Sequence, residues 1–221
     1  MKLGLFGGTF DPIHLGHLRC AEEVCEIFHL DRIIFIPSAR QPLKTEQDIT
    51  RYVHRAKMVQ LAIKDNPNFS ISDLEQRRGG TSYSIDTVNY FLATSPETLE
   101  LNFIVGQDAF QDIHKWKDWK ELLKRCHFIV MTRPGYDAED LSAVLTKDIS
   151  KDYHYDHVSD GFIGPAETSI YFRRLTFLEI SSTDIRTRLA KGQSVRYLVP
   201  EIVHHYISAK KLYSSQSFTG N

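Results

Sequence analysis

Four short apolar segments constrain the fold of this chain more than any other feature of its sequence. They lie at residues 2–6, 32–36, 101–105 and 127–131, and a glycine or a proline follows each within a few residues. The clearest of them, 32–36, is apolar throughout its centre and lacks the polar alternation of a strand with one face in water. Such a strand is typical of a parallel sheet, in which both faces are buried.

Helical patterns separate these strands. We expect helices at 16–28, 53–63, 85–92, 116–123 and 200–212, mainly from apolar residues at helical spacing. Parallel strands that are joined through helices have right-handed crossovers, which place the helices on the two faces of the sheet. The alternation therefore predicts an α/β fold, a Rossmann-like doubly wound parallel sheet with helices on both faces.

Weaker patterns complete the expected element list. They predict a strand at 69–72, one or two strands within 169–180 and a helix at 183–189. The stretch from 137 to 169 is the hardest to assign, with a candidate helix at 137–147 followed by a polar connection at 148–168. We expect one domain at 1–213 and a polar, frayed tail at 214–221.

Charge and cysteine content exclude several classes of protein. The chain has 27 Lys and Arg against 28 Asp and Glu, and this net charge of −1 does not indicate a broad surface for nucleic acid. Its longest apolar runs, about five residues, are far shorter than the roughly 20 that a membrane helix needs. Three cysteines without a Cys-x-x-Cys pair suit a reducing compartment. We therefore expect a cytoplasmic protein.

The turn after the first strand is the most informative segment. It reads Gly-Gly-Thr-Phe-Asp-Pro-Ile-His-Leu-Gly-His at residues 7–17 and leads into the first helix. The backbone N–H groups of Gly7, Gly8, Thr9 and Phe10 lie at the carboxyl end of a strand, where they suit phosphate oxygens. On its own, a Gly-Gly pair is more often an ordinary turn between a strand and a helix.

Two histidines follow at the start of that helix. His14 and His17 are three positions apart, so both project toward one bound anion. Separately, they also fit a helix cap and a packed imidazole. A metal site is the weaker interpretation, because no acidic or thiol partner at metal spacing completes the pair. We therefore name no metal ligand.

A second anion-binding pattern occurs near the other end of the chain. Ser181 and Ser182 suit the cap of a helix that begins near Thr183, and the free N–H groups of that helix form a second anion site. Arg186 lies one turn further on and can donate two hydrogen bonds to a phosphate. By itself this segment also fits a capped surface helix.

Together the two segments resemble one enzyme family. Gly-Gly-Thr-Phe-Asp-Pro-x-His-x-Gly-His at 7–17 and Ile-Ser-Ser-Thr-x-Ile-Arg at 180–186 are similar to the paired motifs of the HxGH nucleotidyltransferases. The resemblance covers nearly the whole chain and is strongest to the bacterial branch that acts on nicotinate mononucleotide. It implies that AMP passes from ATP to nicotinate mononucleotide, giving nicotinate adenine dinucleotide (deamido-NAD) and pyrophosphate in NAD biosynthesis. It also implies that the two motifs converge on one polyphosphate, with Mg²⁺ bridging the triphosphate of ATP.

The resemblance also implies which residues contact ATP and the reacting phosphates. It implies catalytic roles for His14, His17, Lys44 and Arg186. The residues that it places around ATP and its phosphates are Gly7, Gly8, Thr9, Phe10, Arg133, Ser181, Ser182 and Thr183. Without the family, a solvated loop side chain is an equally good interpretation of Lys44, and the better one of Arg133.

The middle of the chain supplies the expected mononucleotide site. The resemblance implies Ser84 near the substrate carboxylate, Gly106 and Asp108 at the ribose, Trp116 against the pyridine ring, and Lys117 beside it. Helix capping and core packing are the alternatives for these residues. Their joint presence is characteristic of the nicotinate-nucleotide branch and is not expected in the phosphopantetheine branch.

The loop after the second strand departs from the family pattern. The family often has Asn-x-x-Pro-Pro-His followed by Lys or Arg, whereas residues 38–44 read Ser-Ala-Arg-Gln-Pro-Leu-Lys. Lys44 keeps a cation for phosphate. Ser38 and Leu43 replace the asparagine and the histidine, so no catalytic role of that histidine is expected here.

Two other functions are consistent with the sequence. Another HxGH transferase would share the outer motifs and use nicotinamide mononucleotide, phosphopantetheine or a cytidylyl substrate. A non-catalytic nucleotide-binding module would share the fold, although it has less need of His14, His17 and Arg186 together. The sequence leaves open whether the chain is a monomer or a homo-oligomer, and it predicts exposed positions for His154 and His157.

Overall fold

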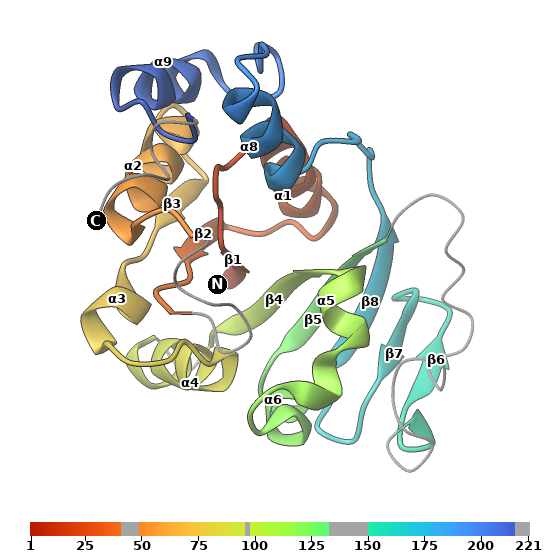
Figure 1. The fold of residues 1–221 in the computed structure, drawn as a ribbon. Helices are drawn as coiled ribbons and strands as arrows, with labels where there is room; N and C mark the ends of the chain where they lie inside the picture. The colour runs from red at the N-terminus through yellow and green to blue at the C-terminus, as the bar shows by residue number, and fades with distance from the viewer. Residues whose placement is uncertain (41–48, 96–97, 133–149, 215–221) are drawn as a thin grey trace.

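The computed structural model describes residues 1–40, 49–95, 98–132 and 150–214 (Figure 1). Within these residues, one sheet has the strand order β3-β2-β1-β4-β5-β8-β7-β6. The strands are β1 (Lys2–Gly8), β2 (Arg32–Pro37), β3 (Phe69–Ile71), β4 (Glu100–Gly106), β5 (His127–Thr132), β6 (His154–Asp156), β7 (Gly161–Ile163) and β8 (Ser169–Arg174). The pairs from β3 to β8 are parallel, and the last two pairs are antiparallel. The Rossmann-like α/β prediction is confirmed.

The helices cover both faces of this sheet. They are α1 (Leu15–Ile27), α2 (Tyr52–Ile63), α3 (Leu74–Arg78), α4 (Ser84–Thr94), α5 (Gln107–Gln111), α6 (Trp119–Arg125), α8 (Ser182–Ala190) and α9 (Glu201–Ala209). Buried side chains of α1, α2, α8 and α9 pack on one face, and those of α4, α5 and α6 pack on the other. The molecule therefore has two apolar cores with the sheet between them.

The inner strands contribute to both cores. In β1, Phe6 belongs to the core with α1, whereas Leu5 belongs to the core with α4. In β4, Ile104 and Phe103 divide in the same way. Successive side chains of a strand point to opposite faces, so a strand without polar alternation needs a cover on each face. This is why the apolar segments of the sequence form the centre of the sheet.

The winding of the chain reverses between β1 and β4. From β1 the chain runs outward to β2 and β3, then returns to β4 and continues to β5 on the other side. The helix that follows β1 packs in one core and the helix that follows β4 packs in the other. Open α/β sheets bind ligands outside the carboxyl ends of their strands at such a reversal. Gly8 and Gly106, which end these two strands, mark that place.

The far end of the sheet differs from the prediction. We expected parallel strands throughout and a polar connection at 148–168, but this stretch contains β6 and β7, which pair antiparallel. Only residues 157–160 connect the two strands. A parallel pairing needs a crossover of about a dozen residues or more, so a turn of this length permits only a hairpin.

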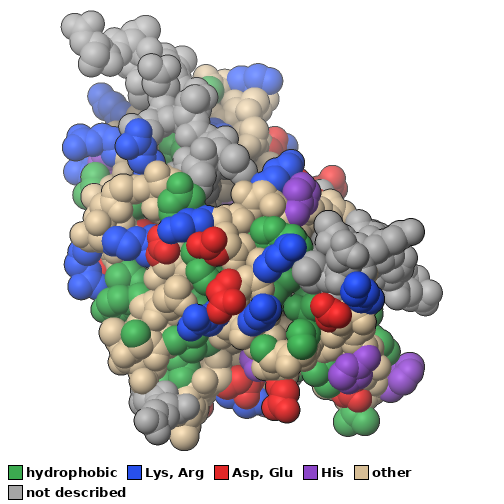
Figure 2. Space-filling view, turned by 90° about the horizontal axis from the view of Figure 1, so that it is seen from below, with side chains coloured by type: hydrophobic (Ala, Val, Ile, Leu, Met, Phe, Trp, Pro, Cys, Tyr) green, Lys and Arg blue, Asp and Glu red, His purple; other side chains and the backbone are tan. Residues whose placement is uncertain are grey.

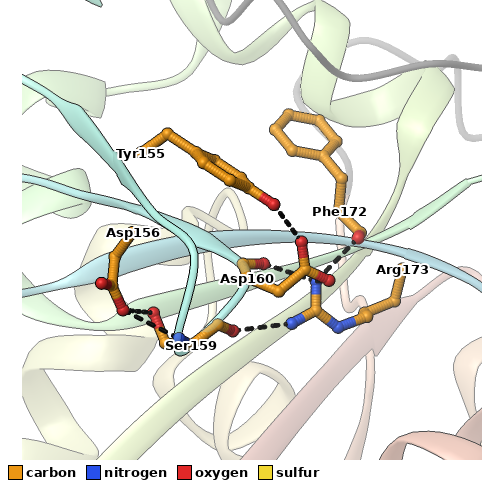
Figure 3. Close-up of polar contacts among 6 residues, drawn as sticks. All are labelled: Tyr155, Asp156, Ser159, Asp160, Phe172 and Arg173. Atoms are coloured by element: carbon orange, nitrogen blue, oxygen red, sulfur yellow. Dashed lines mark hydrogen bonds and ion pairs between the residues drawn. The ribbon is translucent and has the colours of Figure 1, made fainter.

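Arg173 ties this hairpin to the last parallel strand (Figure 3). Its Nη1 donates to the backbone oxygen of Asp160 at 2.7 Å, and its Nη2 donates to that of Ser159 at 3.0 Å. The guanidinium also pairs with the Asp160 carboxylate at 3.1 Å, which accepts a hydrogen bond from the Tyr155 hydroxyl. A basic residue of β8 therefore fixes the turn between β6 and β7.

The region around Trp116 is the second difference. We expected a helix at 116–123, but a 3-10 turn (Ile113–Lys115) ends at Trp116, and α6 begins only at Trp119. Asp118, between them, has a φ of +50°, a left-handed conformation that an α-helix does not contain. The short helices α3 and α5 have no counterpart among the expected helices, since segments of this length show too little periodicity.

Helix α2 is rotated relative to its predicted apolar face. Val53, expected on that face, is 57% exposed. The buried residues of the helix are Arg55, Met58, Val59 and Ile63. Arg55 is only 2% exposed, so a cation occupies the first position of the buried stripe.

Both signs of charge are distributed over one face of the molecule. Figure 2 shows the molecule from below the view of Figure 1, with Lys and Arg side chains interspersed among Asp and Glu on that face. Positive charge is therefore not gathered into one block there. Within the four described ranges, no helix has the length and apolar character needed to cross a membrane. The expected helix at 137–147, and all of the tail except its first residue, lie outside the described residues.

Candidate active site

Close contacts and hydrogen bonds shape the glycine turn after β1. A Cβ atom on Gly8 would lie 2.9 Å from the ring of Phe10, too close for a real side chain. The Gly8 carbonyl accepts the N–H of Ser38 at 2.9 Å, and the Thr9 carbonyl accepts Nη1 of Arg55 at 2.7 Å. Peptide units are planar, so the N–H groups of Thr9 and Phe10 point the opposite way from these carbonyls. The turn therefore directs two N–H groups away from Ser38 and Arg55.

His14 and His17 cap the first turn of α1 reciprocally. The N–H of His17 donates to Nδ1 of His14 at 3.3 Å, and the N–H of His14 donates to Nδ1 of His17 at 3.3 Å. The rings stack with centroids 3.6 Å apart. An Nδ1 atom that accepts a hydrogen bond carries no proton, so the proton of each neutral ring is on Nε2. The cap thus makes both histidines Nε2–H donors.

Burial keeps these two rings neutral. It lowers the pKa of His14 from 6.5 to about 4. The pKa of His17 is also lowered well below 6.5, first by burial and then by the proximity of His14. Near neutral pH the pair therefore presents two uncharged donors to a ligand instead of two cations.

Gly16 permits the approach of the His14 ring. A Cβ atom at this position would lie 3.1 Å from Nδ1 of His14, the atom that accepts the capping hydrogen bond. The N–H of Leu15, at the start of α1, donates to the Leu198 oxygen at 3.0 Å. Protein acceptors therefore already bind N–H groups in the first turn of this helix.

The second motif docks against the first. Ser181 caps α8 as predicted, by accepting the N–H of Asp184 at 3.1 Å. Ser182 does not cap the helix, since its Oγ donates to the Pro12 oxygen at 2.9 Å. Nη1 of Arg186 donates to the Asp11 oxygen at 2.8 Å. The two motifs thus meet in space, and the second motif braces the backbone of the first.

Arg186 also keeps donors for a ligand. Its Nη2 lies 3.4 Å from Oγ1 of Thr183, within the first turn of α8. A guanidinium has five N–H donors, and these bonds to Thr183 and Asp11 use two of them. The side chain can therefore brace the turn and bind an anion at the same time.

The expected mononucleotide residues lie around the start of α4 and the end of β4. Lys117 pairs with Asp86 at 3.2 Å and lies 4.8 Å from the centre of the Tyr83 ring, which brings it beside Ser84. Trp116 packs edge-on against Phe103 of β4, with centroids 5.9 Å apart. Trp116 thus makes a core contact, in partial agreement with the alternative of core packing.

Gly106 and Asp108 lie at the reversal point, at the end of β4 and in the first turn of α5. A Cβ on Gly106 would meet nothing within 4 Å, so the space before it is open. The N-cap residue of α4 is Tyr83, so the alternative of helix capping does not hold for Ser84. The hydroxyl of Ser82 accepts the N–H groups of Ala39 and Arg40, at 3.1 and 3.2 Å.

Some expected site residues have no described position. Lys44 and Arg133 lie outside the described residues, as does Leu43, so their roles stay predictions. Ser38, which replaces the family asparagine, is described, and its hydroxyl is 3.3 Å from the Gly8 oxygen. In the described ranges, no group of three or more His, Cys, Asp and Glu side chains suits a metal ion.

Three buried polar residues that support the site are missing from the sequence-based set. They are Asp11, Arg55 and Tyr213. Asp11 lies inside the motif at residues 7–17, and this position is the sequence signal for it. Arg55 could have been found from the i, i+3, i+4 spacing that it forms with Met58 and Val59. Nothing in the sequence singles out Tyr213.

Comparison with a family model identifies the class. The model of cytidylyltransferase-like proteins matches residues 5–188, a range that includes both motifs. The chain is thus a cytidylyltransferase-like nucleotidyltransferase, in agreement with its sheet topology and with the position of the two motifs at the reversal point.

Individual relatives narrow this class. The chain is 44% identical over 214 residues to a probable nicotinate-nucleotide adenylyltransferase of Geotalea uraniireducens, covering 97% of this chain and 99% of the relative. It is 43% identical over 216 residues to that of Syntrophotalea carbinolica, covering 98% and 99%. The chain belongs to the family of nicotinate-nucleotide adenylyltransferases.

A solved structure shares the fold. It is nicotinic acid mononucleotide adenylyltransferase of Plasmodium falciparum complexed with NaAD, with a TM-score of 0.73 and 19% sequence identity. The similarity covers 96% of this chain and 97% of the other.

Proposed function

We propose that this protein transfers AMP from ATP to nicotinate mononucleotide and so produces nicotinate adenine dinucleotide and pyrophosphate. The observation that carries the proposal is the contact between the two motifs, from Ser182 to Pro12 and from Arg186 to Asp11. It brings the glycine turn, the paired histidines and the start of α8 to one edge of the sheet, as a single polyphosphate site requires. The names of the relatives support nicotinate mononucleotide as the acceptor.

The reaction requires little acid–base catalysis by the protein. The phosphate of the mononucleotide is already an anion near neutral pH, because its second pKa is about 6. One of its oxygens attacks the α-phosphorus of ATP. As that P–O bond forms, the bond to the oxygen that bridges the α- and β-phosphates breaks, and pyrophosphate leaves with the electron pair. The protein must align two anions and stabilise the charge that grows on the leaving group.

The two histidines serve this step as neutral donors. Their Nε2–H groups are available because both Nδ1 atoms accept backbone N–H groups. Donors fixed in advance stabilise developing charge without having to reorganise. Positive charge comes from Lys44 and Arg186, so the stacked rings need not carry charges that would repel each other.

The other site residues divide between the two substrates. On the ATP side are Gly7, Gly8, Thr9 and Phe10 at the phosphates, Ser181, Ser182 and Thr183 at the start of α8, and Arg133 at the adenine. On the mononucleotide side are Ser84, Gly106, Asp108, Trp116 and Lys117. The open space before Gly106 supports this division.

Magnesium enters this reaction with its substrate. Enzymes that transfer a nucleotidyl group from ATP generally need a divalent metal ion. Mg²⁺ usually keeps several waters and binds largely through substrate phosphates. We place the reaction in the cytoplasm, since Cys20, Cys25 and Cys126 are all free thiols.

A panel of acceptors tests the proposal. The purified protein is given Mg·ATP with nicotinate mononucleotide, nicotinamide mononucleotide or phosphopantetheine, and pyrophosphate release is followed. We expect the highest kcat/KM with nicotinate mononucleotide. A clear preference for either other acceptor would replace the proposed substrate, and ATP binding without turnover on any acceptor would favour a nucleotide-binding module.

Two histidine variants, one in the site and one outside it, test whether the activity depends on the site. His17→Ala should lower kcat at least about 100-fold, since it removes a donor to developing charge. The control is His205→Ala, on the exposed face of α9, where the ring is 3.8 Å from Glu201. It should leave kcat unchanged. Near-normal turnover of the His17 variant would remove this residue from the mechanism.

A further inference from the structure

A buried arginine connects three segments of the site. The guanidinium of Arg55 donates to three backbone carbonyls: Nη1 to Thr9 at 2.7 Å, Nη2 to Ser38 at 2.8 Å and Nε to Thr50 at 2.8 Å. Thr9 belongs to the glycine turn, Ser38 follows the end of β2, and Thr50 precedes α2. Each nitrogen of the planar guanidinium therefore donates a hydrogen bond to a different segment.

A nearby carboxylate partly offsets the burial of this cation. Burial lowers the pKa of Arg55, and the charge of Asp11 acts in the opposite direction. Asp11 is itself 2% exposed and is held by two donors. The Tyr213 hydroxyl donates to its Oδ1 at 2.6 Å, and the Thr50 N–H donates to its Oδ2 at 3.1 Å. Arg55 is therefore part of a buried polar network beneath the glycine turn.

The bond to Thr9 sets the direction of a site N–H group. The carbonyl of Thr9 and the N–H of Phe10 belong to one planar peptide, so fixing the first fixes the second. The bond to the Ser38 carbonyl acts indirectly on the neighbouring peptide: it holds the backbone of Ser38, whose N–H donates to the Gly8 carbonyl at 2.9 Å. One guanidinium thus constrains two successive peptides of the turn from the side opposite their N–H groups.

We propose that Arg55 is a positioning residue of the adenylyl-transfer site: it orients the N–H groups of Thr9 and Phe10 toward the polyphosphate by holding the glycine turn and the end of β2 in a fixed relation. This rests on the proposed function for the identity of the ligand. Arg55 does not touch substrate. Its role depends on the planar fork, which a lysine ammonium cannot reproduce.

Two variants and a matched control test this role. Arg55→Lys keeps the charge, and Arg55→Met keeps much of the apolar stem. The control is Arg125→Met on α6, where the arginine is exposed and pairs with Glu121 at 2.8 Å. Hydrogen exchange is measured without substrate at the Ser38 and Thr50 amides, which the network protects. Amides in β4 and β5 report global stability in the same experiment.

We expect at least tenfold faster exchange at Ser38 and Thr50 in both Arg55 variants, with unchanged exchange in β4 and β5. We also expect at least a tenfold lower kcat at saturating substrates, and no rescue by lysine. The Arg125 variant should match the wild type. The proposal is overturned if exchange at Ser38 and Thr50 does not change, if β4 and β5 lose protection in both variants, or if either variant keeps a normal kcat.

The two readouts separate this inference from the proposed function. The exchange measurement uses no substrate and does not depend on which reaction the protein performs. If the wild type fails to turn over nicotinate mononucleotide while the exchange pattern appears as expected, the reaction is wrong and the positioning of the turn stands.

Discussion

The Oγ atom of Ser182 donates a hydrogen bond of 2.9 Å to the backbone oxygen of Pro12, a residue 170 positions earlier in the chain. A second hydrogen bond, from Arg186 to the backbone oxygen of Asp11, joins the same two segments. Together they join the start of α8 to the turn after β1, so the site is a single structure made by both ends of the chain. The second motif has a structural role in addition to its expected contacts with ATP.

Replacing Arg186 should affect both ATP binding and stability, unlike replacing an exposed arginine. Arg186→Met removes the bond to Asp11 and the cation that we propose lies near the triphosphate. We expect the KM for ATP to rise at least about tenfold and the free energy of unfolding to fall by about 1–2 kcal/mol, as for a charged hydrogen bond in a partly buried place. Steady-state kinetics and urea unfolding measure the two effects.

The matched control for this variant is on the same helix. Arg188→Met removes an exposed arginine that pairs with Asp184 at 2.7 Å. Exposed ion pairs contribute about 0–1 kcal/mol, so little change is expected in either measurement. Equal ATP kinetics in the two variants would contradict the role given to Arg186.

Acid should destabilise the protein through His14. Its pKa is about 4 in the folded chain and 6.5 in the unfolded chain, so the unfolded state binds a proton that the folded state does not. The contribution is full above pH 6.5 and is lost as the pH falls toward 4. A difference of 2.5 pKa units corresponds to about 3 kcal/mol.

The reference for this pH dependence is His14→Asn. Asparagine is a good N-cap residue and does not titrate. Urea unfolding of both proteins at pH 7.5, 5.5 and 4 should show the wild type losing about 3 kcal/mol more than the variant. Parallel stability curves would show that His14 is not held in its neutral form.

Gly16→Ala should impair activity more than folding. The added methyl group would lie 3.1 Å from Nδ1 of His14 and would displace the ring from its capping bond. We expect kcat to fall at least about tenfold, while alanine favours the helix by up to about 1 kcal/mol. Kinetics and thermal unfolding test this together. Normal turnover in the variant would mean that the stacked arrangement of the histidines is not needed.

The hydroxyl of Tyr213 should stabilise the folded chain. It donates to the Asp11 carboxylate at 2.6 Å, and both side chains are buried. Tyr213→Phe leaves that carboxylate without one donor, which should cost about 1.5–3 kcal/mol. Tyr197→Phe is the control, since this ring is 85% exposed and should have no effect. A similar melting temperature for the two variants would contradict the importance of the contact.

Periodicity and motif spacing predict the centre of this molecule well. The strands β1, β2, β4 and β5, and the helices α1 and α8, lie where the apolar patterns and the serine cap place them. These elements depend on local sequence and on burial of both faces of the sheet. The joining of the two motifs was also expected, because the family resemblance implies that both converge on one polyphosphate.

The parts that escape prediction depend on contacts between distant residues. The spacing in α2 places Val53 on the buried face, whereas the structure buries Arg55 because three carbonyls and Asp11 surround it. The hairpin of β6 and β7 depends on Arg173, and the left-handed conformation of Asp118 interrupts the expected helix after Trp116. The spacing of Arg55 with Met58 and Val59 indicates its side of the helix, but the local sequence does not show which distant groups these side chains contact.

A structure with a non-hydrolysable ATP analogue tests the central claim most directly. The account predicts one triphosphate in contact with His17 Nε2 and the Phe10 N–H on one side, and with Arg186 on the other. A triphosphate that touches only one of the two motifs, or that binds away from the carboxyl ends of β1 and β4, would contradict it.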